Sequence, residues 1–171
     1  YLLLELGDEE PYLSCSLVAL LMQARRELFQ FNDLLALEAE TRRALERPGS
    51  EFPSIALKAT VAPTLAAQGK TSTARKYLEE ALELAERRCG IGSSVAAVPA
   101  LPLAELLYDA GELDRVEVLL DQYLHTIREW GLVDELAAGV ITRERLIFAK
   151  GDIGEALAGL EEAHIIAIEG G

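Results

Sequence analysis

One two-helix pattern recurs three times in this chain, each time around a glycine at the turn. When Gly69, Gly111 and Gly151 are superimposed, small or apolar residues coincide five and nine positions after the glycine. These residues are Ala74, Val116 and Ala156 at the fifth position and Leu78, Leu120 and Leu160 at the ninth. The glycines that close the units agree to within one position; they are Gly90, Gly131 and Gly171. A repeated helical pair of about 40 residues predicts an α-solenoid, because each unit buries its apolar face only by stacking on its neighbours.

The composition agrees with helices throughout. Half of the 171 residues are apolar and only 6% are aromatic, while leucine, alanine and glutamate dominate. Straight-chain residues lose little rotamer freedom in a helix, so this composition favours helix over strand. We expect an all-α superhelix of stacked antiparallel helix pairs, and the chain is long enough to bury a substantial core.

The repeats also predict the domain organisation, with residues 1–171 forming a single helical-repeat domain. Because the sequence opens on Tyr1 rather than Met, we expect this domain to be a piece of a longer chain. Its predicted parts are the end of a preceding helix at 1–6, a degenerate repeat at 8–49, and repeats at 53–90, 93–131 and 133–171.

The degenerate repeat has no glycine at its turn. A first helix is predicted to begin at an Asp8 cap and to run to about Phe31. Asn32 and Asp33 are then expected to play the turn role that glycine plays in the later repeats.

The repeat at 93–131 carries two prolines in its first helix. Ser93 or Ser94 is predicted to cap this helix, while Pro99 and Pro102 each remove a backbone donor from its N-terminal half. We therefore expect a kink or a late start at this helix.

Charge and hydropathy argue against two classes of partner. The formal net charge is −13, whereas nucleic-acid binding depends on Lys and Arg that displace counterions. The longest uncharged run, 89–104, is too short for a membrane span. Cys15 and Cys89 are far apart and match no metal or redox spacing, which indicates a reduced, cytoplasmic protein. We expect this segment to bind neither nucleic acid nor membrane.

No catalytic, metal or cofactor site is predicted. His125 and His164 stand at offsets that differ by one residue, so they do not converge, and a metal would need further ligands. The adjacent carboxylates Glu79–Glu80 and Glu161–Glu162 diverge around a helix. Since no Ser or Cys has a visible base, we expect a non-catalytic protein.

The offsets around each turn glycine resemble the tetratricopeptide family. An apolar residue stands four positions before the glycine, and the residues are Leu65, Leu107 and Ile147. Two positions depart from the family, since Glu144 and Tyr123 replace small residues, and looser packing is expected there. The segments 105–114 and 150–157 look like the longer repeats of MalT-like, LuxR-type bacterial transcriptional regulators.

This resemblance implies a particular setting. In such regulators a nucleotide-binding domain precedes the repeats, a helix-turn-helix domain follows them, and the repeats receive an inducer or an inhibitory partner. This sequence contains neither a phosphate-binding loop nor a basic recognition helix, so any DNA contact is expected in another domain.

The resemblance also points to a binding groove. In tetratricopeptide-like superhelices the groove is lined by the face of each first helix that does not pack within its own repeat, and offsets three and six before the glycine mark this face. The positions hold Pro63 and Ala66, then Glu105 and Tyr108, then Arg145 and Phe148. Asp109 lies beside Tyr108, and Leu101 lies one turn before Glu105 on the same side.

Two interpretations of these residues remain open. In one, Leu101, Glu105, Tyr108, Asp109, Arg145 and Phe148 bind a ligand or partner together. In the other, Tyr108 and Phe148 wedge between neighbouring repeats and Glu105 pairs with Arg145.

The favoured functional hypothesis is the sensor domain of a bacterial transcriptional regulator, which binds a small inducer or a regulatory protein. A free-standing tetratricopeptide adaptor that grips a peptide is the alternative, and an enzyme is a weaker one. Self-association is also expected, because the ends of a solenoid need polar caps.

Overall fold

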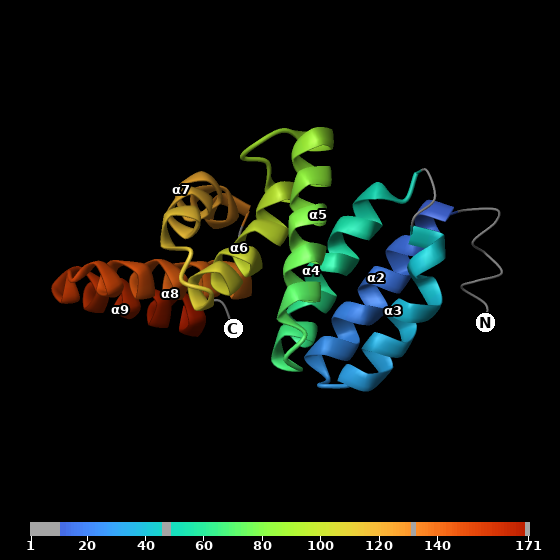
Figure 1. The fold of residues 1–171 in the computed structure, drawn as a ribbon, viewed down its shortest axis with the longest axis horizontal. Helices are drawn as coiled ribbons and strands as arrows, with labels where there is room; N and C mark the ends of the chain where they lie inside the picture. The colour runs from blue at the N-terminus through green and yellow to red at the C-terminus, as the bar shows by residue number, and fades with distance from the viewer. Residues whose placement is uncertain (1–10, 46–48, 131–132, 170–171) are drawn as a thin grey trace. The chain divides into compact units, whose positions relative to one another are not determined.

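All regular elements of the described chain are α-helices (Figure 1). The structure is a computed structural model that describes residues 11–45, 49–130 and 133–169. The helices are α2 (Pro11–Glu27), α3 (Phe31–Leu45), α4 (Glu51–Ala67), α5 (Thr71–Cys89), α6 (Ser94–Asp109), α7 (Leu113–Trp130), α8 (Val133–Lys150) and α9 (Ile153–Glu169). The predicted all-α fold of packed helix pairs is confirmed. The predicted helix at 1–6, the Asp8 cap, Gly131 and Gly171 lie outside the described residues.

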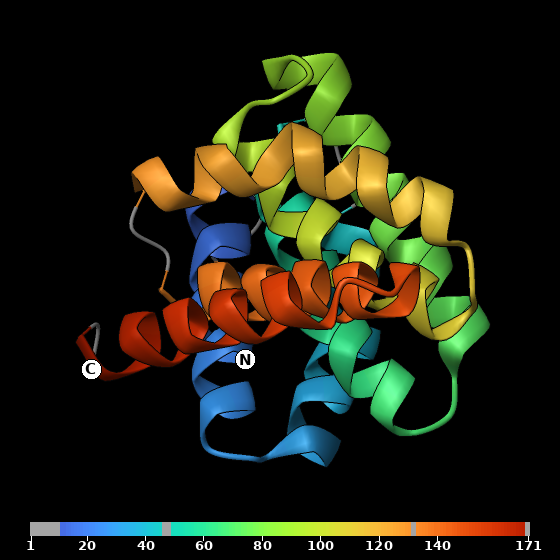
Figure 2. The ribbon, with the colours of Figure 1, turned by 90° about the vertical axis from the view of Figure 1, so that its left-hand side faces the viewer.

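The chain forms two compact units, with the boundary inside α5 between Ala85 and Glu86. In the first unit α2 packs against α3 and α4, and α3 also packs against α4. In the second unit α6 packs against α7 and α8, α7 packs against α8, and α8 runs alongside α9 (Figure 2). Within each unit, neighbouring helix pairs contact one another in sequence order, as a stacked repeat requires.

The turn glycines end their helices in one common way. Gly69, Gly111 and Gly151 all have positive φ, between 77° and 100°. At the first of these turns Gly69 N–H donates to the Ala66 carbonyl at 2.8 Å and Lys70 N–H donates to the Leu65 carbonyl at 2.9 Å. The same pair of bonds closes the turns at Gly111 and Gly151. This is the Schellman motif, which satisfies orphan carbonyls at a helix end and favours glycine.

The α2–α3 pair uses the same turn without a glycine. Phe29 has φ 56°; its N–H donates to the Arg26 carbonyl at 2.9 Å, and Gln30 N–H donates to the Arg25 carbonyl at 2.8 Å. The predicted turn at Asn32 and Asp33 and the predicted helix end near Phe31 are therefore wrong. Asn32 and Asp33 lie inside α3, and the turn comes three residues earlier.

The position of this turn explains why the first helix pair looked degenerate. Counted from Phe29, Leu34 is the fifth residue and is fully buried, like Ala74 after Gly69. The ninth is Glu38, a buried carboxylate that accepts a hydrogen bond from the Tyr77 hydroxyl at 2.8 Å. A hydrogen-bonded glutamate therefore replaces the leucine of the other pairs.

Glu144 and Tyr123, the two residues that depart from the family pattern, are both buried. Tyr123 donates its hydroxyl proton to Oε1 of Glu86 at 2.5 Å. Glu144 accepts from Nε of Arg143 at 2.7 Å, and its carboxylate fills the space beside Gly159. Both positions are thus filled by large, buried side chains.

The helix α6 begins at Ser94, so the predicted late start is wrong. Ser93 is the N-cap, and its hydroxyl oxygen accepts a hydrogen bond from Ala96 N–H at 3.3 Å. Pro99 and Pro102 lie inside the helix, which continues through both of them to Asp109.

Gly139 sets how closely α8 approaches its neighbours. A Cβ on Gly139 would lie 2.7 Å from Cδ1 of Leu124 on α7 and 3.2 Å from Cδ1 of Leu101 on α6. The absent side chain therefore lets α6, α7 and α8 meet closely, which brings the exposed faces of α6 and α8 next to each other.

Candidate binding surface

The structure brings three of the predicted site residues into direct contact. Cζ of Arg145 on α8 lies 4.2 Å from the centre of the Tyr108 ring on α6, a cation–π geometry. The Tyr108 hydroxyl donates in return to the backbone carbonyl of Arg145 at 3.2 Å. A guanidinium nitrogen of Arg145 also lies 2.8 Å from Oδ1 of Asp109. We call Tyr108, Asp109 and Arg145 the Arg145 cluster.

This arrangement differs from the predicted pairing of Glu105 with Arg145. Asp109 rather than Glu105 holds the guanidinium. Glu105 and Asp109 are both exposed, on the side of α6 that also carries the half-buried Tyr108. The carboxylates of Glu105 and Asp109 therefore give the cluster an acidic border.

An exposed stripe on α8 adjoins the cluster. Ile141, Arg145 and Phe148 follow one another at intervals of four and three residues, so they share one helix face. Ile141 is 42% exposed and Phe148 is 59% exposed. Sequence reasoning missed Ile141, although its position one turn before Arg145 could have indicated it.

Leu101 plays a different part from the one expected. It is 3% exposed, and its Cδ1 atom packs at Gly139 where α6 meets α8. A partner at the surface would not touch this side chain. Leu101 supports the cluster from below by holding α6 against α8.

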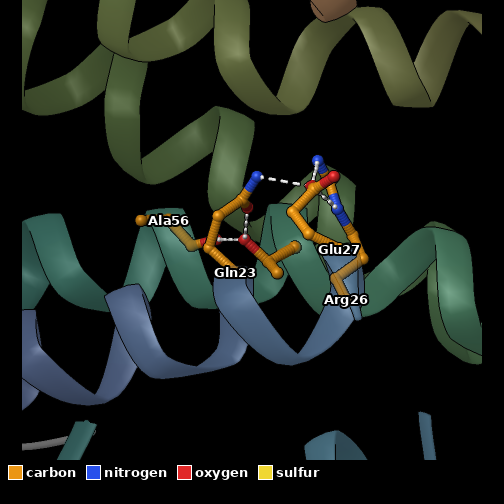
Figure 3. A network of polar contacts seen from close by, with 5 residues as sticks. Gln23, Arg26, Glu27 and Ala56 are labelled. Carbon is orange, nitrogen blue, oxygen red and sulfur yellow. Dashed lines mark hydrogen bonds and ion pairs between the residues drawn. The ribbon is translucent and has the colours of Figure 1, made fainter. Parts of the chain in front are cut away.

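The corresponding face in the first unit is polar. Counting from Phe29 places Arg26 and Gln23 at the offsets that Tyr108 and Glu105 occupy in α6. Nε2 of Gln23 donates a hydrogen bond to Oε1 of Glu27 at 3.0 Å, and Arg26 donates to the same oxygen at 2.9 Å (Figure 3). The Thr60 hydroxyl lies 3.4 Å from Oε1 of Gln23. Sequence reasoning missed these residues because it placed the turn at Asn32 and Asp33.

The α4 helix contributes little to such a surface. Its two residues at the marked offsets are Pro63 and Ala66, both half-buried. Neither side chain carries a polar group that could bind a ligand. Among the described residues at the marked offsets, the aromatic side chains lie on α6 and α8.

Metal-ligating side chains do not cluster among the described residues. No group of three or more His, Cys, Asp and Glu side chains among them could hold a metal ion. Nε2 of His125 lies 3.3 Å from Glu129 one turn later on α7, and both side chains are exposed. None of the described helices is both long and apolar enough to span a bilayer.

Comparison with known proteins gives information on the fold. No protein-family model matches the sequence, and no curated protein matches it. The fold is similar to the crystal structure of BtubC (BKLC) from P. vanneervenii, with a TM-score of 0.71 and 22% sequence identity. The similarity covers 93% of this chain and 65% of the BtubC chain. At this identity the likeness extends to the helical architecture alone.

Proposed function

We propose that this chain is a non-catalytic binding module that recognises a protein or peptide through the exposed faces of α6 and α8. The observation that carries this proposal is the position of the Arg145 cluster between the exposed side chains of Ile141 and Phe148. Aromatic residues and arginine are enriched in the energetically important centres of protein interfaces, and this surface combines both.

The geometry favours a protein partner over a small inducer. Small-molecule sites bury most of the ligand inside a cleft. Phe148 instead leaves more than half of its surface exposed on a helix face, where a partner segment could cover it. A segment with apolar side chains would bury Ile141 and Phe148, and its polar groups would meet Arg145 and the acidic border.

The cluster is already ordered before a partner arrives. Tyr108 and Asp109 hold the guanidinium of Arg145 from two sides, so little side-chain freedom remains to be lost on binding. The contact also joins α6 to α8, which means that a partner bound there would bridge two helix pairs. Binding could then change how these pairs stack.

We place this module in a bacterial transcriptional regulator as the broader setting. The resemblance of segments 105–114 and 150–157 to the repeats of MalT-like, LuxR-type regulators supports this setting. In it, the repeat domain would receive a regulatory protein and leave DNA binding to another domain. The net charge of −13 supports that division, because it disfavours contact with a phosphate backbone.

The test is a selection of binding peptides from a random library displayed on phage, with the purified chain as target. Selected peptides are then synthesised, and their affinities are measured by calorimetry for wild type, Arg145→Ala and Phe148→Ala. We expect each substitution to weaken binding by about tenfold or more, which corresponds to at least about 1.4 kcal/mol.

The matched control is Val118→Ala on α7, because Val118 is as exposed as Phe148 but lies outside the proposed surface. This variant should bind the peptides like wild type. Peptides whose affinity is unchanged by both Arg145→Ala and Phe148→Ala would refute the proposed surface. A parallel thermal-shift screen of metabolites on the same variants would reveal a small inducer instead.

A further inference from the structure

The α6–α8 surface belongs to the more acidic of the two units. Residues 86–171 contain 16 Asp and Glu against 7 Lys and Arg, so this unit carries a net charge of −9 out of the total of −13. Between Arg88 and Arg115, a stretch that includes all of α6, the sequence has no Lys, Arg or His. Every charged side chain of α6 is therefore a carboxylate, on Glu105 or Asp109.

The two carboxylates of α6 lie where their own helix does not stabilise them. Glu105 and Asp109 are four residues apart on one helix face, and like charges at this spacing destabilise a helix. Asp109 is also the last residue of α6, at the negative end of the helix dipole, and no basic residue stands in the last turn. On α5, by contrast, Glu79 pairs with Arg75 at the same spacing. A cation supplied from outside α6 would therefore stabilise its two carboxylates.

Arg145 supplies such a cation to Asp109 but not to Glu105. Its guanidinium group lies 2.8 Å from Oδ1 of Asp109, so these two charges compensate each other. Glu105 is exposed, and no residue of the described chain forms a hydrogen bond or ion pair with it. One uncompensated negative charge therefore remains beside the Arg145 cluster.

Two contacts between α6 and α8 show which part of α8 lies level with Glu105. Leu101 of α6 packs at Gly139 of α8, and further along both helices the Arg145 cluster joins them again. The two helices therefore run in the same direction, and Glu105 lies on α6 between these two contacts. The exposed apolar side chain of α8 at this level is Ile141. A segment that covers Ile141 therefore brings its neighbouring side chains close to Glu105.

We propose that the partner segment is cationic, and that it places a Lys or Arg against Glu105 while its apolar side chains cover Ile141 and Phe148. This inference rests on the proposed function, because it names the chemistry of the partner at the same surface. Charge complementarity of this kind steers association and selects among partners. An acidic segment would instead meet an uncompensated carboxylate in a unit of net charge −9.

The first experiment asks which charge the binding peptides carry. The probe is a random peptide library displayed on phage, selected on the full chain at low salt. Peptides that bind through the α6–α8 surface are identified by their loss of affinity for Phe148→Ala. We expect these peptides to contain more Lys and Arg than Asp and Glu, and their binding should weaken as salt rises.

This experiment separates failure of the inference from failure of the proposed function. Peptides that depend on Phe148 but are neutral or acidic would overturn the inference and leave the binding surface standing. A selection that yields no peptide dependent on Phe148 would overturn both.

Charge variants distinguish a contact at Glu105 from general attraction to an acidic protein. Glu105→Gln should weaken binding of the cationic peptides about two- to fivefold, which is the range of an exposed ion pair. Asp121→Asn on α7 is the matched control, because it removes the same charge from an exposed position outside the surface, and it should bind like wild type. Circular dichroism verifies that each variant stays folded. Equal weakening by the two substitutions would overturn the inference.

A charge exchange tests the pairing directly. In the tightest cationic peptide each Lys and Arg is replaced in turn by Glu. Glu105→Lys should bind the original peptide less tightly than wild type does, and it should bind one of the exchanged peptides more tightly than wild type does. If no exchanged peptide gains affinity for Glu105→Lys, the cation of the segment does not lie against Glu105 and the inference is wrong.

Discussion

The carboxylate of Glu144 on α8 occupies the space that a side chain at position 159 of α9 would need. A Cβ on Gly159 would lie 2.0 Å from Cδ of Glu144, far inside van der Waals contact. In the two preceding helix pairs the residue seven before the turn is small, Ala62 or Ala104, and the residue eight after it is large, Tyr77 or Leu119. The last pair exchanges the two sizes, so the volume between its helices is kept.

This exchange predicts strong coupling between the two positions. Gly159→Ala alone should destabilise the protein by about 1–3 kcal/mol, because a buried carboxylate must move. In the Glu144→Ala background the same change should cost less than about 0.5 kcal/mol, since the space is then free. Urea unfolding of the four proteins of this cycle measures the coupling, and additive effects would contradict the geometry.

Glu144→Ala by itself should be nearly neutral. Oε2 of Glu144 is buried and has no hydrogen-bond partner within the described chain, so the wild type carries a desolvated oxygen. Arg143 keeps access to water after the change, which limits the cost of losing its partner. We expect a difference in unfolding free energy within about 1 kcal/mol, measured by the same urea titration. A loss of several kcal/mol would show that the ion pair stabilises the unit.

Substitutions at the turn residues Phe29 and Gly69 should change the stability of the protein in opposite directions. Phe29 has φ 56° and is 80% exposed. Burial of its side chain therefore contributes little stability to offset the cost of the left-handed backbone. Phe29→Gly should stabilise the protein by about 0.5 kcal/mol, after the greater unfolded-state entropy of glycine is counted.

Gly69→Ala is the matched change at the equivalent turn. Its Cβ would meet no atom within 4 Å, so any effect comes from φ 78° alone. We expect a loss of about 1 kcal/mol, measured by thermal and urea unfolding of both variants. If Phe29→Gly destabilises as much as Gly69→Ala, the left-handed turn at Phe29 is not strained.

The buried hydroxyl of Tyr123 predicts a loss of stability at alkaline pH. Burial raises the pKa of the Tyr123 phenol above its ordinary value, and the hydrogen bond to Glu86 raises it further. An unfolded tyrosine ionises near pH 10, approximately, whereas the folded one stays neutral there. The stabilisation that the Tyr123 hydroxyl contributes is therefore fully present below about pH 10 and is lost as the pH rises further.

The measurement compares urea unfolding of wild type and Tyr123→Phe at neutral and strongly alkaline pH. The variant should be less stable at neutral pH by about 1–2 kcal/mol, because the bond to Glu86 is lost. It should also lose less stability than wild type as the pH rises. Parallel pH profiles of the two proteins would exclude this role for the hydroxyl.

The contact between Tyr108 and Arg145 should be measurable in the absence of any partner. In a double-mutant cycle with Tyr108→Leu and Arg145→Leu, we expect a coupling of about 0.5–1 kcal/mol, because half-exposed cation–π pairs are of this size. Glu105→Leu with Arg145→Leu is the control cycle and should show no coupling. Coupling in the control alone would favour the pairing of Glu105 with Arg145 that the sequence suggested.

Helix positions, and three of the four turns inside the described helix pairs, could be predicted from the sequence because they depend on local chemistry. A glycine at positive φ ends a helix wherever it stands, and apolar residues spaced by three and four positions define the buried side. For this reason α4 ends at Ala67 and α8 ends at Lys150, each within two residues of its turn glycine, Gly69 or Gly151. The offsets also identified Tyr108 and Arg145, since both mark the same face of successive first helices.

Tertiary packing decided the features that depend on two segments at once. Phe29 adopts the left-handed turn because α2 and α3 must reverse at that residue to bury Leu34, a constraint that local preference does not reveal. Asp109 rather than Glu105 forms the ion pair with Arg145. The close approach of α6 to α8 at Gly139 sets which carboxylate lies within reach of the guanidinium group.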